Sequence, residues 1–149
     1  MSKSDTKAVA TVLRELGQRL ELEGGNPYRA RAYRRAADNL SLSPLPLDRL
    51  IAEGRLKEIP GIGDALAAVI TGLHETGNHP RLAALREGTP EGVLEMLRVP
   101  GLPAERVRKL HKELGITSLA DLQDAALSGR LASTKGYGAA FQAKVLRGL

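Results

Sequence analysis

The sequence of 149 residues contains no cysteine and no tryptophan, and its only aromatic residues are three tyrosines and one phenylalanine. The absence of cysteine excludes a disulfide framework and thiolate metal ligands. So few aromatic rings argue against the stacking platforms that hold single-stranded nucleic acids. The sequence also lacks an apolar run of membrane-spanning length and the apolar core of an amino-terminal signal peptide. We therefore expect a cytoplasmic protein with no membrane partner.

The charged residues are unbalanced toward the basic side, with 22 lysines and arginines against 17 acidic residues. A net charge of +5 favours polyanionic partners. Arginine outnumbers lysine 15 to 7, which suits bidentate phosphate contacts, although a GC-rich genome would give the same bias. The length allows one substantial domain or two small ones.

The most informative stretch covers residues 59–63, Ile-Pro-Gly-Ile-Gly, which an alanine-rich apolar segment follows. Two closely spaced glycines allow a tight turn with backbone angles that a side chain would forbid. They also let a phosphate approach the main chain, where the first N–H groups of the next helix have no partners. This pattern is typical of a helix-hairpin-helix, which binds nucleic-acid backbone without reading sequence. Its candidate DNA contacts are Gly61, Ile62, Gly63, Asp64 and Ala65.

A similar turn motif recurs in residues 99–103 and 135–138. The first glycines of the three copies are 40 and then 35 residues apart. In the second copy Pro103 replaces the second glycine and removes one N–H. In the third copy Lys135 replaces the turn proline. Ordinary helix-turn-helix connections are the alternative, most of all for the third copy. The candidate DNA contacts are Gly101, Leu102, Lys109, Gly136 and Gly138. We interpret Lys109 and Lys144 as phosphate contacts or solvated charges, and not as nucleophiles.

The hydrophobic spacing is helical throughout, and no segment alternates as a strand would. We therefore predict an all-α fold of small helical subdomains built on helix-hairpin-helix motifs, with no sheet. The best boundary lies at residues 86–90, between domains 1–87 and 88–149. Caps are predicted at Asp5, at Asn26 before Pro27, and at Ser118. The expected helices span about 6–24 (ending near Gly24-Gly25), 27–40, 47–53, 64–75, 80–87, 90–97 and 103–114, and one more begins at 118.

Three segments together carry a family resemblance. An arginine-rich helix over residues 26–37 is followed by the hairpin at 59–63 and then by Thr76-Gly77, in the order found at the amino terminus of X-family DNA polymerases of bacterial or beta-like type. Residues 97–101, 108–110 and 114–119 resemble the fingers of the same family. The resemblance covers about residues 8–149.

The resemblance implies a division of labour in DNA repair, specifically base excision repair. An eight-kilodalton lyase-like domain, here residues 1–87, would bind the 5′-phosphate side of a gapped duplex. The fingers-like residues 88–149 would grip the duplex on the primer side. The implied partner is gapped, nicked or duplex DNA, and a bacterial protein would then be associated with the nucleoid. No protein partner is indicated.

The resemblance also implies binding residues. A 5′-phosphate pocket falls on Arg29, Tyr33 and Lys57, of which the first two share one helix face. Each of the first two hairpins is expected to hold Na⁺ or K⁺ through main-chain carbonyls. These carbonyls are those of Lys57, Ile59 and Ile62, and of Leu97, Val99 and Leu102.

Catalysis is not expected from this sequence. The Asp-x-Asp pair that holds catalytic Mg²⁺ in the family palm occurs nowhere. The family's Schiff-base lysine falls on Val69, and a phosphate-binding lysine falls on Ala65. The three histidines are dispersed and lack metal-ligand spacing. Two alternatives stay open: a residual 5′-deoxyribose-phosphate or abasic-site lyase, and an amino-terminal fragment of an X-family polymerase.

Overall fold

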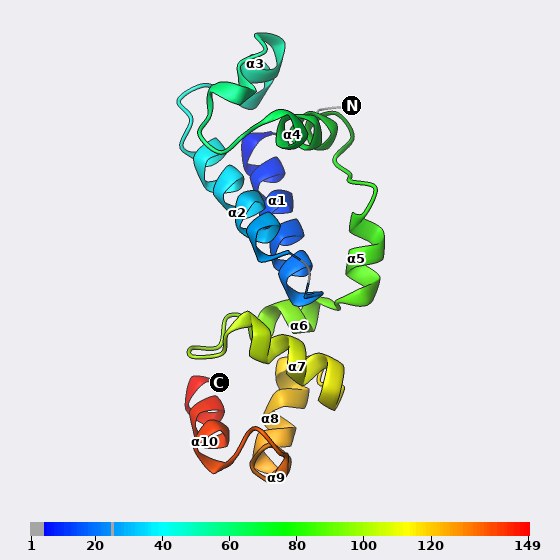
Figure 1. The fold of residues 1–149 in the computed structure, drawn as a ribbon, viewed down its shortest axis with the longest axis vertical. Helices are drawn as coiled ribbons and strands as arrows, with labels where there is room; N and C mark the ends of the chain where they lie inside the picture. The colour runs from blue at the N-terminus through cyan, green and yellow to red at the C-terminus, as the bar shows by residue number, and fades with distance from the viewer. Residues whose placement is uncertain (1–4, 25) are drawn as a thin grey trace. The chain divides into compact units, whose positions relative to one another are not determined.

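The computed structural model describes residues 5–24 and 26–149, and these residues form helices joined by short turns (Figure 1). Within them there is no strand, as the all-α prediction requires. None of the described helices combines the length and apolar character needed to cross a bilayer. The elements are α1 (Thr6–Leu22), α2 (Pro27–Ser41), α3 (Leu47–Ala52), η1 (Leu56–Glu58), α4 (Asp64–Thr76), α5 (Leu82–Gly88), α6 (Glu91–Met96), α7 (Ala104–Leu114), α8 (Leu119–Leu127), α9 (Arg130–Ser133) and α10 (Ala139–Gly148).

The predicted caps open their helices. Asp5 accepts a hydrogen bond from the N–H of Ala8 at 2.8 Å, and Asn26 accepts one from Tyr28 at 2.9 Å beside Pro27. These side chains satisfy N–H groups that lack a partner within the helix. The first helix ends at Leu22, earlier than predicted. The predicted end at Gly25 lies outside the described residues.

The helices gather into two compact units, each with its own core. The first unit contains the chain up to Glu21 and α2 through Leu85. Its centre includes the fully buried Leu13, Leu40 and Ile70. The second unit contains residues 22–24 and 86–149, and Leu110 and Leu122 are buried in its core. Apolar burial of this kind contributes about 25 cal/mol per Å² and holds each unit's turns in place.

Candidate nucleic-acid interface

Three turns of the chain share one hydrogen-bond pattern and precede helices α4, α7 and α10. The fourth residue of each turn donates its N–H to the carbonyl of the first at 3.1 Å: Ile62 to Ile59, Leu102 to Val99, and Tyr137 to Thr134. The third residue is glycine with a positive φ in each: +89° at Gly61, +79° at Gly101 and +91° at Gly136. This position of a type II turn requires a left-handed backbone that only glycine adopts readily.

The helices that follow these turns begin without a side-chain cap. Gly63, Pro103 and Gly138 occupy the cap positions, and none supplies a capping side chain. The first helical bond of α4 joins the N–H of Ala67 to the carbonyl of Gly63 at 2.9 Å. The N–H groups of the first turn therefore have no described acceptor, whereas α2 and α8 begin with side-chain caps. Unsatisfied N–H groups and the positive end of the helix dipole favour an anion here.

Gly61 and Gly63 differ in what they require. Gly63 has a φ of −100°, which any residue adopts, so the prediction that both glycines need a special backbone is wrong for Gly63. Both residues are exposed, and nothing lies within 4 Å of the position that a Cβ of Gly63 would take. Gly63 therefore leaves open space in front of the main chain. The intervening Ile62 is 4% exposed and anchors the turn in the core.

The first residue of α4 is an acid paired with a base. Asp64 Oδ1 lies 2.8 Å from Lys57 Nζ. The Lys57 ammonium holds the pKa of the Asp64 carboxyl below its usual value, and the carboxylate raises the pKa of Lys57. Both side chains are well exposed, so water weakens their attraction. Lys57 offsets the negative charge that Asp64 would present to an approaching phosphate, and the neighbouring Ala65 is exposed.

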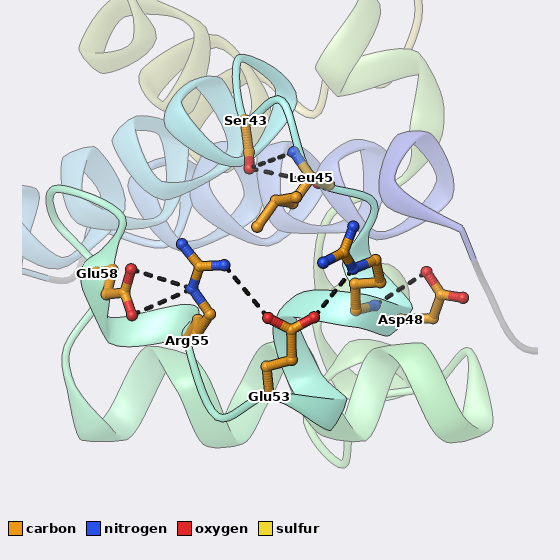
Figure 2. A network of polar contacts seen from close by, with 7 residues as sticks. Ser43, Leu45, Asp48, Glu53, Arg55 and Glu58 are labelled. Atoms are coloured by element: carbon orange, nitrogen blue, oxygen red, sulfur yellow. Dashed lines mark hydrogen bonds and ion pairs between the residues drawn. The ribbon is translucent and has the colours of Figure 1, made fainter.

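A surface network fixes the segment that leads into this turn. Figure 2 shows Arg55 between two carboxylates, with Nη1 3.2 Å from Glu53 and Nε 3.2 Å from Glu58. Glu53 also contacts Arg49 at 2.9 Å, and hydrogen bonds from Arg49 and then Arg55 lower the pKa of its carboxyl. The network joins α3 to η1, the 3₁₀ helix that ends directly before Ile59.

Helix α2 packs against the first hairpin with two side chains that the sequence analysis did not place there. Asn39 Nδ2 donates to the carbonyl of Pro60 at 2.7 Å. The Arg35 side chain lies beside Gly61, with Nε 3.4 Å from the position of a Cβ on that glycine. Of the neighbouring arginines, Arg34 instead pairs with Glu21 at 2.6 Å. Arg34 and Arg35 are adjacent in sequence but point in different directions around the helix. Only the folded structure shows which neighbour each of them contacts.

The second and third hairpins are tied together through α7. Pro103 is the cap of α7 and not its first residue, which corrects the predicted start. Arg106 donates to the carbonyl of Gly136 at 2.9 Å, and its guanidinium lies 5.0 Å from the ring centre of Tyr137. Leu102 is buried. Lys109 is exposed and lies 3.7 Å from Glu105, one turn away on the same helix.

The residues assigned to a 5′-phosphate pocket occupy two places in the first unit. Arg29 is exposed and Tyr33 is 5% exposed, one turn apart on α2. Lys57 lines a cavity of about 190 Å³ whose lining includes Ala67 and Thr71 but neither α2 residue.

The charge of Arg29 acts on His79, a histidine that the sequence analysis did not connect with any other residue. Burial, then the charge of Arg81 and that of Arg29, lower the pKa of the His79 imidazole. Arg81 donates its N–H to His79 Nδ1 at 3.1 Å. The charges of Arg29 and Arg81 therefore both act on the His79 imidazole, which couples the start of α2 to the segment after α4. No sequence spacing signals it, because Arg29 belongs to a distant part of the chain.

Comparison with protein families identifies the first unit's motif. The model of the helix-hairpin-helix domain family matches residues 4–79, about half of the chain. The chain belongs to the helix-hairpin-helix domain family. The matched segment contains the first hairpin, with its uncapped α4 and its exposed Gly63.

The helix-hairpin-helix chain also has a curated relative. It is 30% identical over 144 residues to the DNA polymerase/3′-5′ exonuclease PolX of Bacillus subtilis (strain 168), which confirms the resemblance to the amino-terminal region of X-family polymerases. The match covers 96% of this chain and 25% of the relative. The chain thus spans about a quarter of the length of this relative.

Within the described residues, no three histidine, aspartate or glutamate side chains gather where a metal ion would bind. Val69 lies partly buried against the core of the first unit and carries no amine. The main-chain carbonyls expected to hold a monovalent cation stay a prediction. The carbonyls of Ile59 and Val99 each accept one turn hydrogen bond, which leaves one lone pair on each oxygen for a further contact.

Proposed function

We propose that this chain binds DNA through backbone phosphates, without sequence preference. One observation carries the proposal: the same exposed turn occurs three times, and each copy opens a helix whose first N–H groups lack a described acceptor. The net charge of +5 adds a general attraction to polyanions. The relative PolX is by name a DNA polymerase, which supports DNA as the polyanion.

Backbone recognition suits the composition better than base recognition does. Stacking platforms need several aromatic side chains on one surface, whereas Tyr137 and Phe141 are half-buried and lie 5.4 Å apart in the second unit. Main-chain N–H groups at a helix start bind any phosphate, whatever base it carries. Affinity should therefore fall steeply with salt, because phosphate neutralisation releases counterions.

The preferred DNA in this proposal is a gapped or nicked duplex with a 5′-phosphate, as in repair. The positive charges of Arg29 and Arg81 support this choice, because both act on the His79 imidazole near the start of α2. Guanidinium forms charge-assisted, bidentate bonds with phosphate oxygens. The proposal keeps Tyr33, one turn along α2, and Lys57, which lines a different cavity, as further contacts to the DNA end.

The proposal includes Na⁺ or K⁺ at the first two hairpins, held by main-chain carbonyls between protein and phosphate. A hard monovalent cation suits neutral carbonyl oxygens. No role is proposed for Mg²⁺, since the sequence has no Asp-x-Asp pair.

The proposed activity is binding without catalysis. Val69 and Ala65 replace the two lysines that the lyase chemistry of the family uses. The nearest amine by alignment is Lys57, and its bond to Asp64 raises its pKa, which favours the protonated, non-nucleophilic form. A residual lyase that uses Lys57 is the alternative, and the polymerase activity in the relative's name is not assigned to this chain.

Substitution of Gly63 by valine tests the proposal. The branched side chain enters the open space in front of the main chain, so affinity for duplex DNA should fall about tenfold or more, in line with ~1.5–3 kcal/mol for a charge-assisted hydrogen bond. Fluorescence anisotropy with a labelled duplex measures the change.

Gly72→Val is the matched control, because Gly72 lies within α4 and a Cβ there also meets nothing within 4 Å. Circular dichroism verifies that both variants fold. An unchanged affinity for Gly63→Val would contradict the assignment.

A further inference from the structure

The second hairpin lacks a donor that the first one has. In the first hairpin the N–H of Gly63 has no described acceptor and is open to a ligand. The corresponding residue of the second hairpin is Pro103, the cap of α7, which has no N–H. The turns are otherwise alike, with a 3.1 Å hydrogen bond and a positive φ at the turn glycine in each.

A lysine from another helix lies against this incomplete hairpin. Lys144 belongs to α10, and its Nζ lies 2.8 Å from the position that a Cβ of Gly101 would take, with its Cε closer still. One turn further along α10, a Cβ on Gly148 would lie 3.0 Å from Val99 and 3.3 Å from Pro100. Helix α10 thus ends beside the turn between α6 and α7 (Figure 1) and brings the ammonium to it.

The Lys144 ammonium is available to a ligand. The side chain is exposed, and no carboxylate of the described residues pairs with it. Several other lysines and arginines of the chain do have such partners, for example Lys57 with Asp64 and Lys109 with Glu105. An unpaired ammonium on the surface of a turn offers three N–H donors and a full positive charge.

The first hairpin has an equivalent arrangement. There Arg35 of α2 lies beside Gly61, and Asn39, one turn along the helix, contacts Pro60. In both hairpins a helix from elsewhere in the same unit therefore places a cation beside the turn glycine and a second residue beside the turn proline. The cation lies closest where the main chain has lost its donor.

We propose that Lys144 is a DNA-phosphate ligand of the second hairpin and supplies the donor that Pro103 lacks. The ligand is a phosphodiester of the DNA backbone, and the inference rests on the proposed function. The ammonium of α10 completes a site whose remaining donors are the N–H groups at the start of α7. The first hairpin offers the N–H of Gly63 in addition to Arg35, whereas the second offers Lys144 in place of that N–H.

Lys144→Met tests the inference, because methionine retains much of the apolar stem over Gly101 and removes the charge. Affinity for duplex DNA should fall severalfold, and the slope of log K against log[salt] should become shallower by about 0.9, the value for one phosphate contact. Lys144→Arg should stay close to the wild type. Arg147→Met is the matched control, since Arg147 is an exposed cation on the same helix and its loss changes the net charge equally.

A second variant tests the compensation directly. Pro103→Gly restores an N–H at the cap, so it should recover part of the affinity lost in Lys144→Met and gain less in the wild-type background. Circular dichroism follows folding in each variant. If the wild type binds DNA and Gly63→Val weakens it, but Lys144→Met behaves like Arg147→Met, the role of Lys144 is overturned while the proposed function stands. If the wild type does not bind duplex DNA, both fail.

Discussion

The charge of His79 depends on the groups that surround it. Burial first, and the charges of Arg81 and Arg29 next, disfavour its protonated form and lower its pKa. A 5′-phosphate bound by the two arginines would reverse this effect, because a nearby anion stabilises the imidazolium. Phosphate bound there would therefore raise the pKa of His79, and by linkage a lower pH would strengthen phosphate binding.

The preference for a 5′-phosphate over a 5′-hydroxyl should accordingly grow as the pH falls from about 8 to about 6, through the ordinary histidine range near 6.5. Anisotropy titrations with gapped DNA bearing either end measure the preference. His79→Asn keeps an acceptor for the main-chain N–H of Arg81 and removes the titrating imidazole. Only the phosphate itself then titrates, and its protonation at lower pH opposes the rise in preference. Equal affinities for the two ends at both pH values would show that the pocket holds no phosphate.

At the scale of one element, the two glycines of the first hairpin are expected to have different roles. Gly61 should matter for folding, and Gly63 should matter for binding. Gly61→Ala forces a Cβ onto a backbone at φ +89° and should lower the free energy of unfolding by about 1–2 kcal/mol. Gly63→Ala, at φ −100° and with open space around it, should be neutral or stabilising by up to ~1 kcal/mol. Urea denaturation of the two variants distinguishes these signs. A loss of stability in Gly63→Ala equal to that in Gly61→Ala would remove the distinction.

Most helices could be predicted because their signals are local. Asn26 before Pro27 and Ser118 before α8 act on residues within one turn, and the apolar spacing between them repeats along the chain. The short elements η1 and α9 were not predicted, because three or four residues are too few to show a repeating helical period.

The hairpin positions and their glycines were likewise readable from the sequence. The placement of Arg35, Lys144 and Arg106 around the hairpins was not, because it depends on which face of a distant helix packs on each turn. The distinct role of Gly63 could not be predicted either. The sequence does not show whether a glycine is needed for its backbone angle or for the open space that it leaves.

For the molecule as a whole, the decisive chemical test of binding without catalysis is whether the protein forms a Schiff base with DNA. We expect that it forms none. Such an intermediate needs an uncharged amine against the sugar aldehyde, and Val69 supplies none, while Lys57 is bound to Asp64. Borohydride reduction of the protein with DNA that carries a 5′-deoxyribose phosphate should trap no covalent adduct. Val69→Lys should gain one if the pocket retains the family's shape. An adduct in the wild type that Lys57→Ala abolishes would make the chain an enzyme.

The open space before Gly63 also has a genetic consequence. Every amino acid except proline carries the same main-chain N–H donor. A contact made by such a donor therefore depends on the absence of a blocking side chain and not on the presence of a particular one. At Ala65, exposed at the start of α4, most codons leave the N–H unchanged. At Gly63, by contrast, each added side-chain atom narrows the way to the phosphate. If the first hairpin binds DNA as proposed, its affinity should therefore tolerate most side chains at the start of α4 and fall with any side chain at Gly63.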